Sequence, residues 1–274
     1  MTFPIVTVIG AGHMGSSLIG GLINDGHPPE KIIAADPSEK ALISLQEIFP
    51  IHTTTNNSMA IQTTDVVIFA VKPQSFKEVA EPLSEVIQAK RPLVISVAAG
   101  IRVDSIEHWL GSDVAIVRAM PNTPALIGCG ATALYANKQV NSKQHALAES
   151  ILRAVGIVVW LEKEALMDAV TALSGSGPAY FFLVMEALQE SAEKLGIPRE
   201  TARLLTLQTA LGAARMAIES GTSLTELRQQ VTSPGGTTEK ALSVLEEKDI
   251  RQLLHEAVMA AKSRSEELAE LLGK

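Results

Sequence analysis

The feature that most constrains the fold is a glycine-rich loop close to the amino terminus. An apolar run at residues 5–9 leads directly into the loop GAGHMG, and a segment of helical length follows. Glycines at this spacing between a strand and a helix bind the pyrophosphate of a dinucleotide, because backbone N–H groups and the helix dipole both face the anion. The sequence therefore predicts a dinucleotide-binding unit, with Gly10 in the tight turn, Gly12 beside the pyrophosphate and Gly15 at the contact between helix and strand.

Short runs of β-branched and apolar residues recur through the first part of the chain. Their apolar residues are continuous rather than alternating, which is typical of strands covered on both faces. Helical or turn segments separate the runs, so the sequence predicts an α/β fold, a Rossmann-type doubly wound and mostly parallel sheet. The predicted strands are residues 5–9, 32–35, 66–70, 93–96 and 114–117, and the runs at 131–135 and 157–160 extend the same sheet.

After about residue 162 the strand-like runs end and long segments rich in Ala, Leu, Glu and Gln follow. We therefore predict a dinucleotide-binding domain at residues 1–162 and an all-helical domain at 163–274. The stretch 202–218 is apolar around most of its circumference, and so small a domain cannot surround it alone. A second subunit is expected to cover it. The predicted helices are 164–173, 178–195, 199–219, 224–231, 238–247 and 251–272.

Charge and cysteine content exclude several kinds of partner. The net charge of −7 leaves no excess of cations for nucleic acid or an anionic membrane surface. The single cysteine, Cys129, cannot form an internal disulfide, and we expect it to be a small buried residue. No signal core, membrane span or metal-ligand spacing is visible, so we expect a cytoplasmic protein without a metal site.

The identity of the dinucleotide depends on the end of the second predicted strand. Asp36 lies there, where an acid usually pairs with the adenosine ribose hydroxyls of NAD. Taken alone it disfavours NADP, because a carboxylate repels a 2′-phosphate. Two further segments, residues 70–73 and 98–100, follow predicted strands at the edge where open α/β sheets bind ligands. Lys72 has two interpretations, a contact with the cofactor or a loop cap.

Two later segments place small polar residues and glycines before predicted helices. They are residues 172–180, ALSGSGPAY, and residues 231–239, VTSPGGTTE. Backbone donors and a helix dipole at such a position suit a small carboxylate. The alternative for each is an ordinary turn between helices with a Ser or Thr cap. Ser176 does not fit a hydrolase nucleophile elbow, because Ser174 and Pro178 occupy the positions where the pattern G-x-S-x-G requires glycine.

Taken together, these segments resemble the pyrroline-5-carboxylate reductase family over essentially the full length of the chain. The resemblance implies reduction of 1-pyrroline-5-carboxylate to L-proline, the last step of proline synthesis, by NADPH or alternatively NADH. It also implies helical domains that interleave in a homodimer, often stacked into a decamer, with each active site between one subunit's nucleotide domain and its partner's helical domain. The motifs that carry it are residues 10–15, AVKP at 70–73, RAMPNTP at 118–124, SGSGP at 174–178 and TSPGGTT at 232–238.

The resemblance also implies roles for individual residues. The substrate carboxylate is expected at backbone N–H groups near Gly236, and the Thr238 hydroxyl is expected to hydrogen-bond the ring nitrogen as it becomes an amine. The implied substrate contacts are Ser174, Ser233, Gly236, Thr237 and Thr238. The implied cofactor contacts are Gly10, Ala11, Gly12, His13, Met14, Gly15, Asp36, Asn57, Ala70, Val71, Lys72, Pro73, Ala98, Ala99 and Gly100.

Two rival functions share the same organisation. One is a reductase or dehydrogenase that acts on a β-hydroxyacid or another imine. The other is a regulator that binds the nucleotide or an amino acid without turnover. Oxidation of the reduced cofactor on addition of pyrroline carboxylate would distinguish both from the family's reaction.

Overall fold

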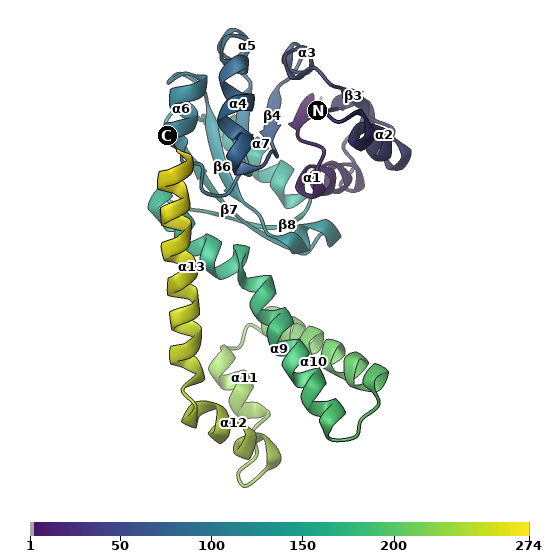
Figure 1. Ribbon diagram of the computed structural model, residues 1–274, viewed down its shortest axis with the longest axis vertical. Coiled ribbons are helices and arrows are strands. Elements are labelled where there is room, and N and C mark those ends of the chain that lie inside the picture. The colour runs from purple at the N-terminus through teal and green to yellow at the C-terminus, as the bar shows by residue number, and fades with distance from the viewer. Residues whose placement is uncertain (1–2, 274) are drawn as a thin grey trace. The chain divides into compact units, whose positions relative to one another are not determined.

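A computed structural model describes residues 3–273, and the chain divides into two compact units (Figure 1). The first unit contains the residues up to Ser176 together with those from Ala261 onward. The second unit is Gly177–Ala260. The last helix, α13 (Ile250–Leu272), therefore begins in the second unit and ends in the first.

The first unit is built on an eight-stranded sheet with the order β3-β2-β1-β4-β5-β6-β7-β8. Neighbouring strands are parallel except β6 and β7, which are antiparallel. This arrangement confirms the predicted mostly parallel, doubly wound sheet. The strands are β1 (Val6–Ile9), β2 (Ile32–Ala35), β3 (His52–Thr54), β4 (Val66–Phe69), β5 (Leu93–Ser96), β6 (Ile116–Met120), β7 (Gly130–Ala136) and β8 (Gly156–Trp160).

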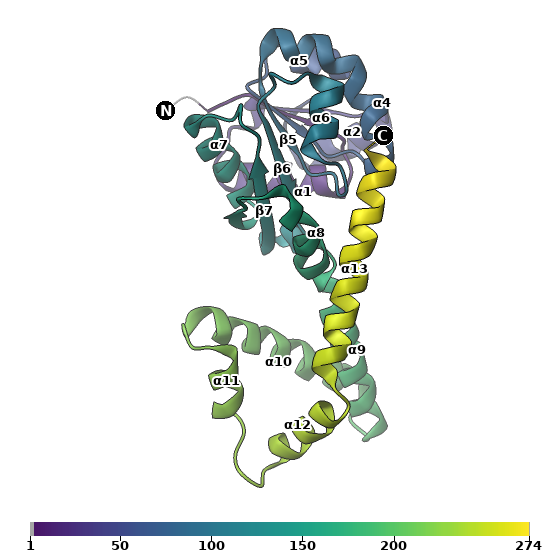
Figure 2. The ribbon, with the colours of Figure 1, turned by 90° about the vertical axis from the view of Figure 1, so that its left-hand side faces the viewer.

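Helices cover both faces of this sheet, as the continuous apolar runs predict (Figure 2). Alternate residues of β1 face opposite layers, because Val6 and Val8 belong to one buried cluster and Ile9 to the other. The first cluster includes α1 (His13–Asn24), α2 (Glu39–Ile48) and α7 (Ser142–Arg153). The second includes α3 (Asn57–Ile61), α4 (Phe76–Ala80), α5 (Ser84–Lys90), α6 (Val103–Leu110) and Leu272 of α13.

Two strands differ from the sequence prediction by more than one residue at an end. The strand predicted at 114–117 begins two residues later, because the Asn137 carboxamide engages the backbone before it. Its Nδ2 donates to the Val114 carbonyl at 2.9 Å and its Oδ1 accepts the Ile116 N–H at 3.0 Å. The short strand β3 was not predicted, since its residues His52-Thr53-Thr54 are polar and none of them is fully buried.

The helix predicted at 164–173 is also irregular. It consists of a 3₁₀ turn (Glu164–Leu166), α8 (Met167–Val170) and a π-helix (Thr171–Gly175), after which α9 begins at Gly177. The Ser176 N–H donates to the Thr171 carbonyl at 2.8 Å, five residues back. One of the backbone donors predicted for this segment, the Ser176 N–H, is therefore already used within the helical run.

The second unit is helical, as predicted for this part of the chain, but it is shorter than the predicted domain at 163–274, since residues up to Ser176 and from Ala261 onward belong to the first unit. It contains α9 (Gly177–Lys194), α10 (Arg199–Glu219), α11 (Leu224–Gln230), α12 (Thr237–Glu247) and the start of α13. Large apolar side chains of α9 and α10 stay exposed, including Phe181 at 71% and Leu211 at 54%. Within the described chain, the apolar stretch 202–218 is thus largely uncovered.

Cys129 corrects another expectation, because it is exposed rather than buried. It follows a 3₁₀ turn (Thr123–Ile127) and Gly128, whose left-handed φ of 71° ends that turn at the surface. Its neighbour Ile127 is exposed as well. Among the helices of residues 3–273, none combines the length and the apolar character that crossing a bilayer requires.

Candidate functional site

The glycine loop between β1 and α1 has two glycines that the fold requires and one that faces open space. Gly10 has φ +106°, and a Cβ there would lie 2.7 Å from the Ala70 carbonyl oxygen. A Cβ on Gly15 would overlap the carbonyl oxygen of Gly10. Gly12, in contrast, has no heavy atom within 4 Å of the position its Cβ would take. The loop is therefore closely packed on its inner side and open at Gly12.

The open side coincides with the amino terminus of α1. Gly12 is the N-cap residue, no side chain caps this helix, and no acidic residue lies in its first turn. The first N–H groups of a helix have no partner within the helix and carry partial positive charge. A bare glycine beside such donors leaves room for a phosphate to reach the backbone. These residues therefore fit the pyrophosphate of a dinucleotide.

Asp36 holds the glycine loop against the end of β2. One carboxylate oxygen accepts the Ala11 N–H at 2.8 Å, and the other accepts the Ser38 N–H at 2.9 Å. Each oxygen retains lone pairs for further donors such as ribose hydroxyls. Lys31 and Lys40 are the lysines nearest to Asp36 in the sequence, and neither forms an ion pair with this carboxylate in the described part of the chain.

The other predicted cofactor segments lie at the same carboxyl edge of the sheet. The Ala70 N–H donates to the Ile9 carbonyl at 2.8 Å, and the Val97 N–H donates to the Phe69 carbonyl at 3.1 Å. These bonds place residues 70–73 and 98–100 directly after neighbouring strands. Asn57 begins α3, which packs against β1 and β2.

Two of these side chains have polar groups without a partner in the described chain. The Oδ1 atom of Asn57 is buried and accepts no hydrogen bond. A carboxamide held in this way can gain a donor when a ligand or water reaches it. Lys72 is exposed and is the N-cap residue of the 3₁₀ turn that follows, but its side chain forms no capping hydrogen bond there, so both interpretations of Lys72 stay open.

The second candidate segment is the loop between α11 and α12. Gly236 is the N-cap of α12, and no side chain caps the helix, so the Ser or Thr cap is absent here. The loop is shaped instead by backbone bonds, in which the Gly236 N–H donates to the Ser233 carbonyl at 3.0 Å. The Gly235 N–H donates to a carboxylate oxygen of Glu239 at 2.8 Å. The prediction of a glycine-rich loop opening a helix is confirmed for this segment.

The hydroxyl groups of this loop are available to a ligand. Those of Ser233, Thr237 and Thr238 make no hydrogen bond within residues 3–273, whereas the Thr232 hydroxyl donates to the Arg228 carbonyl at 2.6 Å. Thr238 is half-buried and Ser233 and Thr237 are exposed. The arrangement offers helix N–H groups and free hydroxyls to a small anion.

Ser174 belongs to the first unit and not to this loop. It lies in the π-helix, and its hydroxyl donates to the Val170 carbonyl at 3.1 Å. Its own carbonyl accepts the Nδ2–H of Asn122 at 3.0 Å. The structure thus brings Ser174 to the end of β6, while the other predicted substrate contacts lie in the second unit.

Sequence reasoning did not single out two polar side chains beside these segments. Asn122 lies within the motif at 118–124, but no signal distinguished its carboxamide from its neighbours. Glu164 carries no local signal, because the groups that it binds are 46 and 61 residues away in the sequence.

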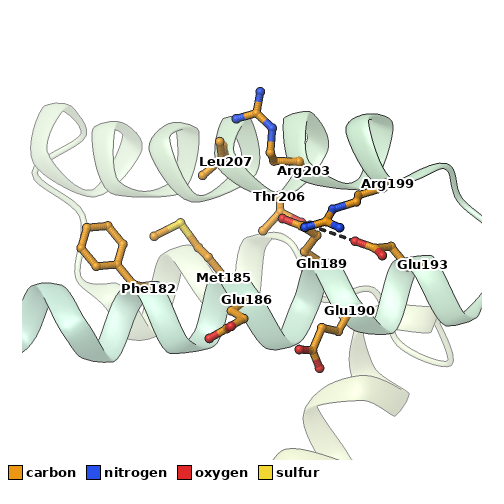
Figure 3. A pocket seen from close by; sticks show the side chains of 10 residues that line it. All are labelled: Phe182, Met185, Glu186, Gln189, Glu190, Glu193, Arg199, Arg203, Thr206 and Leu207. Carbon is orange, nitrogen blue, oxygen red and sulfur yellow. Dashed lines mark hydrogen bonds between the residues drawn. The ribbon is translucent and has the colours of Figure 1, made fainter.

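The largest of the pockets described contains none of the predicted site residues (Figure 3). It has a volume of about 610 Å³ and lies between α9 and α10, where Met185 and Gln189 of α9 face Thr206 of α10. The Gln189 Nε2–H donates to Glu193 at 2.9 Å. Within residues 3–273, no group of three or more His, Cys, Asp or Glu could hold a metal ion.

Two family models match the chain. Residues 164–268 match the model described as pyrroline-5-carboxylate reductase dimerisation. Residues 5–100 match the model described as NADP oxidoreductase, coenzyme F420-dependent. The dimerisation match begins just after β8, at the change from the sheet to the helical segments, whereas the NADP oxidoreductase match ends after β5, before the last three strands of the sheet.

Individual relatives match from end to end. A pyrroline-5-carboxylate reductase of Pseudomonas aeruginosa is 49% identical over 274 residues, which is 100% of both chains. A solved structure of a pyrroline-5-carboxylate reductase from Coxiella burnetii is 49% identical with a TM-score of 0.94, covering 97% of this chain and 99% of that one. The pyrroline carboxylate reductase of Plasmodium falciparum, solved with NADP bound, is 31% identical with a TM-score of 0.87, covering 97% and 98%.

Proposed function

The chain belongs to the pyrroline-5-carboxylate reductase family, and we propose that it reduces 1-pyrroline-5-carboxylate to L-proline with NADPH. The observation that carries this proposal is the 49% identity with the Pseudomonas aeruginosa reductase over 274 residues. The open glycine loop supports it, because Gly12 and the uncapped start of α1 fit a dinucleotide pyrophosphate. The helical part from about residue 163 onward is the domain that we expect to bind substrate and to dimerise.

NADPH supplies the hydride when it is bound, and the chain supplies its binding and alignment. The backbone around Gly12 binds the pyrophosphate, and Asp36 fixes the loop at the adenosine end. NADH is the alternative cofactor, because the Asp36 charge disfavours a 2′-phosphate. The residues proposed to contact the cofactor are Gly10, Ala11, Gly12, His13, Met14, Gly15, Asp36, Asn57, Ala70, Val71, Lys72, Pro73, Ala98, Ala99 and Gly100.

The substrate is held by the loop between α11 and α12. Backbone N–H groups of Gly236, Thr237 and Thr238 bind its carboxylate, with the helix dipole acting in the same direction. The Thr238 hydroxyl hydrogen-bonds the ring nitrogen, and so orients the C=N bond for attack at C5. A protonated imine already accepts hydride, so the site needs no strong base. Ser233 and Ser174 complete the proposed contacts.

The enzyme is an oligomer, and we place each active site between two protomers of a homodimer. The exposed apolar faces of α9 and α10 support this, because a water-exposed face of that extent usually marks a subunit interface. A decamer of such dimers is the larger assembly to be tested. A cytoplasmic location is part of the proposal and is supported by the lone, exposed thiol of Cys129, which a reducing compartment preserves.

Steady-state kinetics with pyrroline carboxylate and each reduced cofactor in turn tests the reaction, the substrate and the coenzyme together. We expect oxidation of NADPH that depends on pyrroline carboxylate and yields proline. Turnover of another imine or of a β-hydroxyacid, without turnover of pyrroline carboxylate, would show that the proposed substrate is wrong. Binding of cofactor without any turnover would favour a regulator instead.

A further inference from the structure

A single carboxylate oxygen joins three separate segments of the first unit. Oε1 of Glu164 accepts a hydrogen bond from the Arg118 guanidinium at 2.7 Å and another from the Val103 N–H at 2.9 Å. The Arg118 side chain is only 4% exposed and that of Glu164 is 22% exposed. A charge-assisted pair with so little access to water is held in one geometry.

Each of the three segments leads into part of the proposed site. Val103 begins α6, three residues after Gly100. Arg118 lies in β6, which ends at Met120 and continues into the turn that contains Asn122. Glu164 itself begins the helical run that ends with the π-helix around Ser174.

Glu164 also supplies a missing helix cap. The N-cap residue of α6 is Arg102, and its side chain forms no capping hydrogen bond. The first N–H groups of a helix need acceptors from outside the helix, and a negative charge there is favourable. The Glu164 carboxylate provides both from 61 residues further along the chain. It therefore fixes the start of α6 and, with it, the end of the loop at residues 98–100.

The turn after β6 is fixed by a second set of contacts. Oδ1 of Asn122 accepts the Ala131 N–H at 2.9 Å, while its Nδ2–H donates to the Ser174 carbonyl at 3.0 Å. Gly175 packs so closely on Met120 that a Cβ there would lie 2.6 Å from its methyl carbon. The π-helix, β6 and β7 thus form one connected structure, which the Arg118–Glu164 pair joins to α6.

We propose that Glu164 is a positioning residue that, through Val103 and Arg118, aligns residues 98–100 and the turn at 120–122 for the reduction. The inference rests on the proposed function, in which residues 98–100 line the cofactor. Arg118 makes no other ion pair within residues 3–273. Removing Glu164 would therefore leave a buried cation without a partner and the start of α6 without a cap. Residues 98–100 and the turn at 120–122 would then no longer be held by the same carboxylate.

The test compares Glu164→Ala with Glu162→Ala, which removes an exposed carboxylate two residues earlier. For Glu164→Ala we expect kcat/KM for NADPH to fall by about 10- to 100-fold, since small misplacements of reacting groups have costs of this size. For Glu162→Ala we expect a change of less than about twofold, as for most surface substitutions. Hydrogen exchange of the cofactor-free protein should show faster exchange over residues 101–104 in Glu164→Ala only.

A double variant separates positioning from stability. Arg118→Met with Glu164→Ala removes the unpaired buried charge, so its Tm should recover toward the wild-type value. Its kcat/KM and its fast exchange over residues 101–104 should not recover, because the Val103 N–H still lacks its acceptor. The double variant also decides the matter if Glu164→Ala alone does not fold.

Three results would overturn the inference. One is a Glu164→Ala variant with the same kcat/KM as an active wild-type enzyme. Another is unchanged exchange over residues 101–104 in that variant. The third is a double variant whose kinetics recover along with its Tm. A wild type without any turnover of pyrroline carboxylate would refute the proposed function itself, which is a separate result.

Discussion

The glycine loop of the first unit and the α11–α12 loop of the second unit differ in how completely one chain builds them. Around the glycine loop, Asp36 accepts two backbone N–H groups, and Gly10 and Gly15 pack against neighbouring backbone. In the second loop, the hydroxyls of Thr237 and Thr238 have no partner within the described residues, and apolar faces of the same unit stay exposed. The comparison teaches that contacts within one chain hold the glycine loop in place, whereas the α11–α12 loop, which we propose binds substrate, keeps hydroxyls without a partner beside an uncovered apolar face.

The largest expected effect tests whether a second chain covers the apolar face of α10. Leu211→Asp places a carboxylate at a position that is 54% exposed in one chain. If a partner buries this position, the unpaired charge should dissociate the oligomer and abolish turnover, because burying such a charge costs several kcal/mol. Light scattering with activity measurements checks this.

Ile48→Asp is the matched control. Ile48 ends α2 of the first unit and is 69% exposed. The oligomer and its activity should survive this change. Dissociation by both variants, or by neither, would contradict the proposed location of the interface.

The next effect concerns the inner side of the glycine loop. Gly10→Ala forces a side chain into φ +106° and against the Ala70 carbonyl. Strained backbone conformations of this kind cost about 1–3 kcal/mol, and the steric overlap adds to that. Urea denaturation should show a lower free energy of unfolding.

Gly12→Ala is the counterpart on the open side of the loop. It meets no atom within 4 Å, so it should leave stability unchanged and weaken NADPH binding. Equal loss of stability in both variants would contradict the distinction between the two glycines.

A smaller effect is expected at the substrate loop. Thr238→Ala removes a hydroxyl that bonds nothing in the described chain, so the Tm should stay the same. If the hydroxyl bonds the charged ring nitrogen, kcat/KM for pyrroline carboxylate should fall about 10- to 150-fold, which corresponds to ~1.5–3 kcal/mol. Thr238→Ser should retain most of the activity. An unchanged kcat/KM in Thr238→Ala would remove this residue from the mechanism.

The smallest effect is a pH dependence in the first unit. Burial lowers the pKa of His27, whose Nε2 is buried without a partner in the described chain. The unfolded state therefore binds the proton more readily, and stability should fall as the pH drops through the ordinary His range near 6.5. His27→Gln should flatten the dependence of Tm on pH between about 7 and 5. A wild-type Tm that rises on acidification in this window would contradict a lowered pKa of His27 in the folded state.

The sequence predicted the parts of the molecule that depend on local patterns. Continuous apolar runs placed the strands that carry the cofactor edge, and α10 begins and ends at the predicted residues. Strand β3 escaped prediction, since three polar residues carry no hydrophobic signal. Patterns of glycine and small polar residues located the α11–α12 loop but could not show which hydroxyls lack partners.

Features that depend on contacts distant in sequence could not be predicted. The π-helix before α9 is held by Asn122 and by the contact of Gly175 with Met120, more than 50 residues away. The role of Glu164 depends on Arg118 and Val103, which only the folded sheet brings beside it. The exposure of Cys129 follows from a surface turn and not from its residue type.

The central claim is that each active site combines the glycine loop of one protomer with the α11–α12 loop of the other. Heterodimers of Gly12→Val and Thr238→Ala chains, isolated with two different tags, test it most directly. If sites form between protomers, one site of each heterodimer contains both substitutions and the other contains neither, so turnover should return to about half the wild-type value per dimer. If each site is built from one chain, both sites carry a substitution, and heterodimers no more active than the two parent variants would contradict the account.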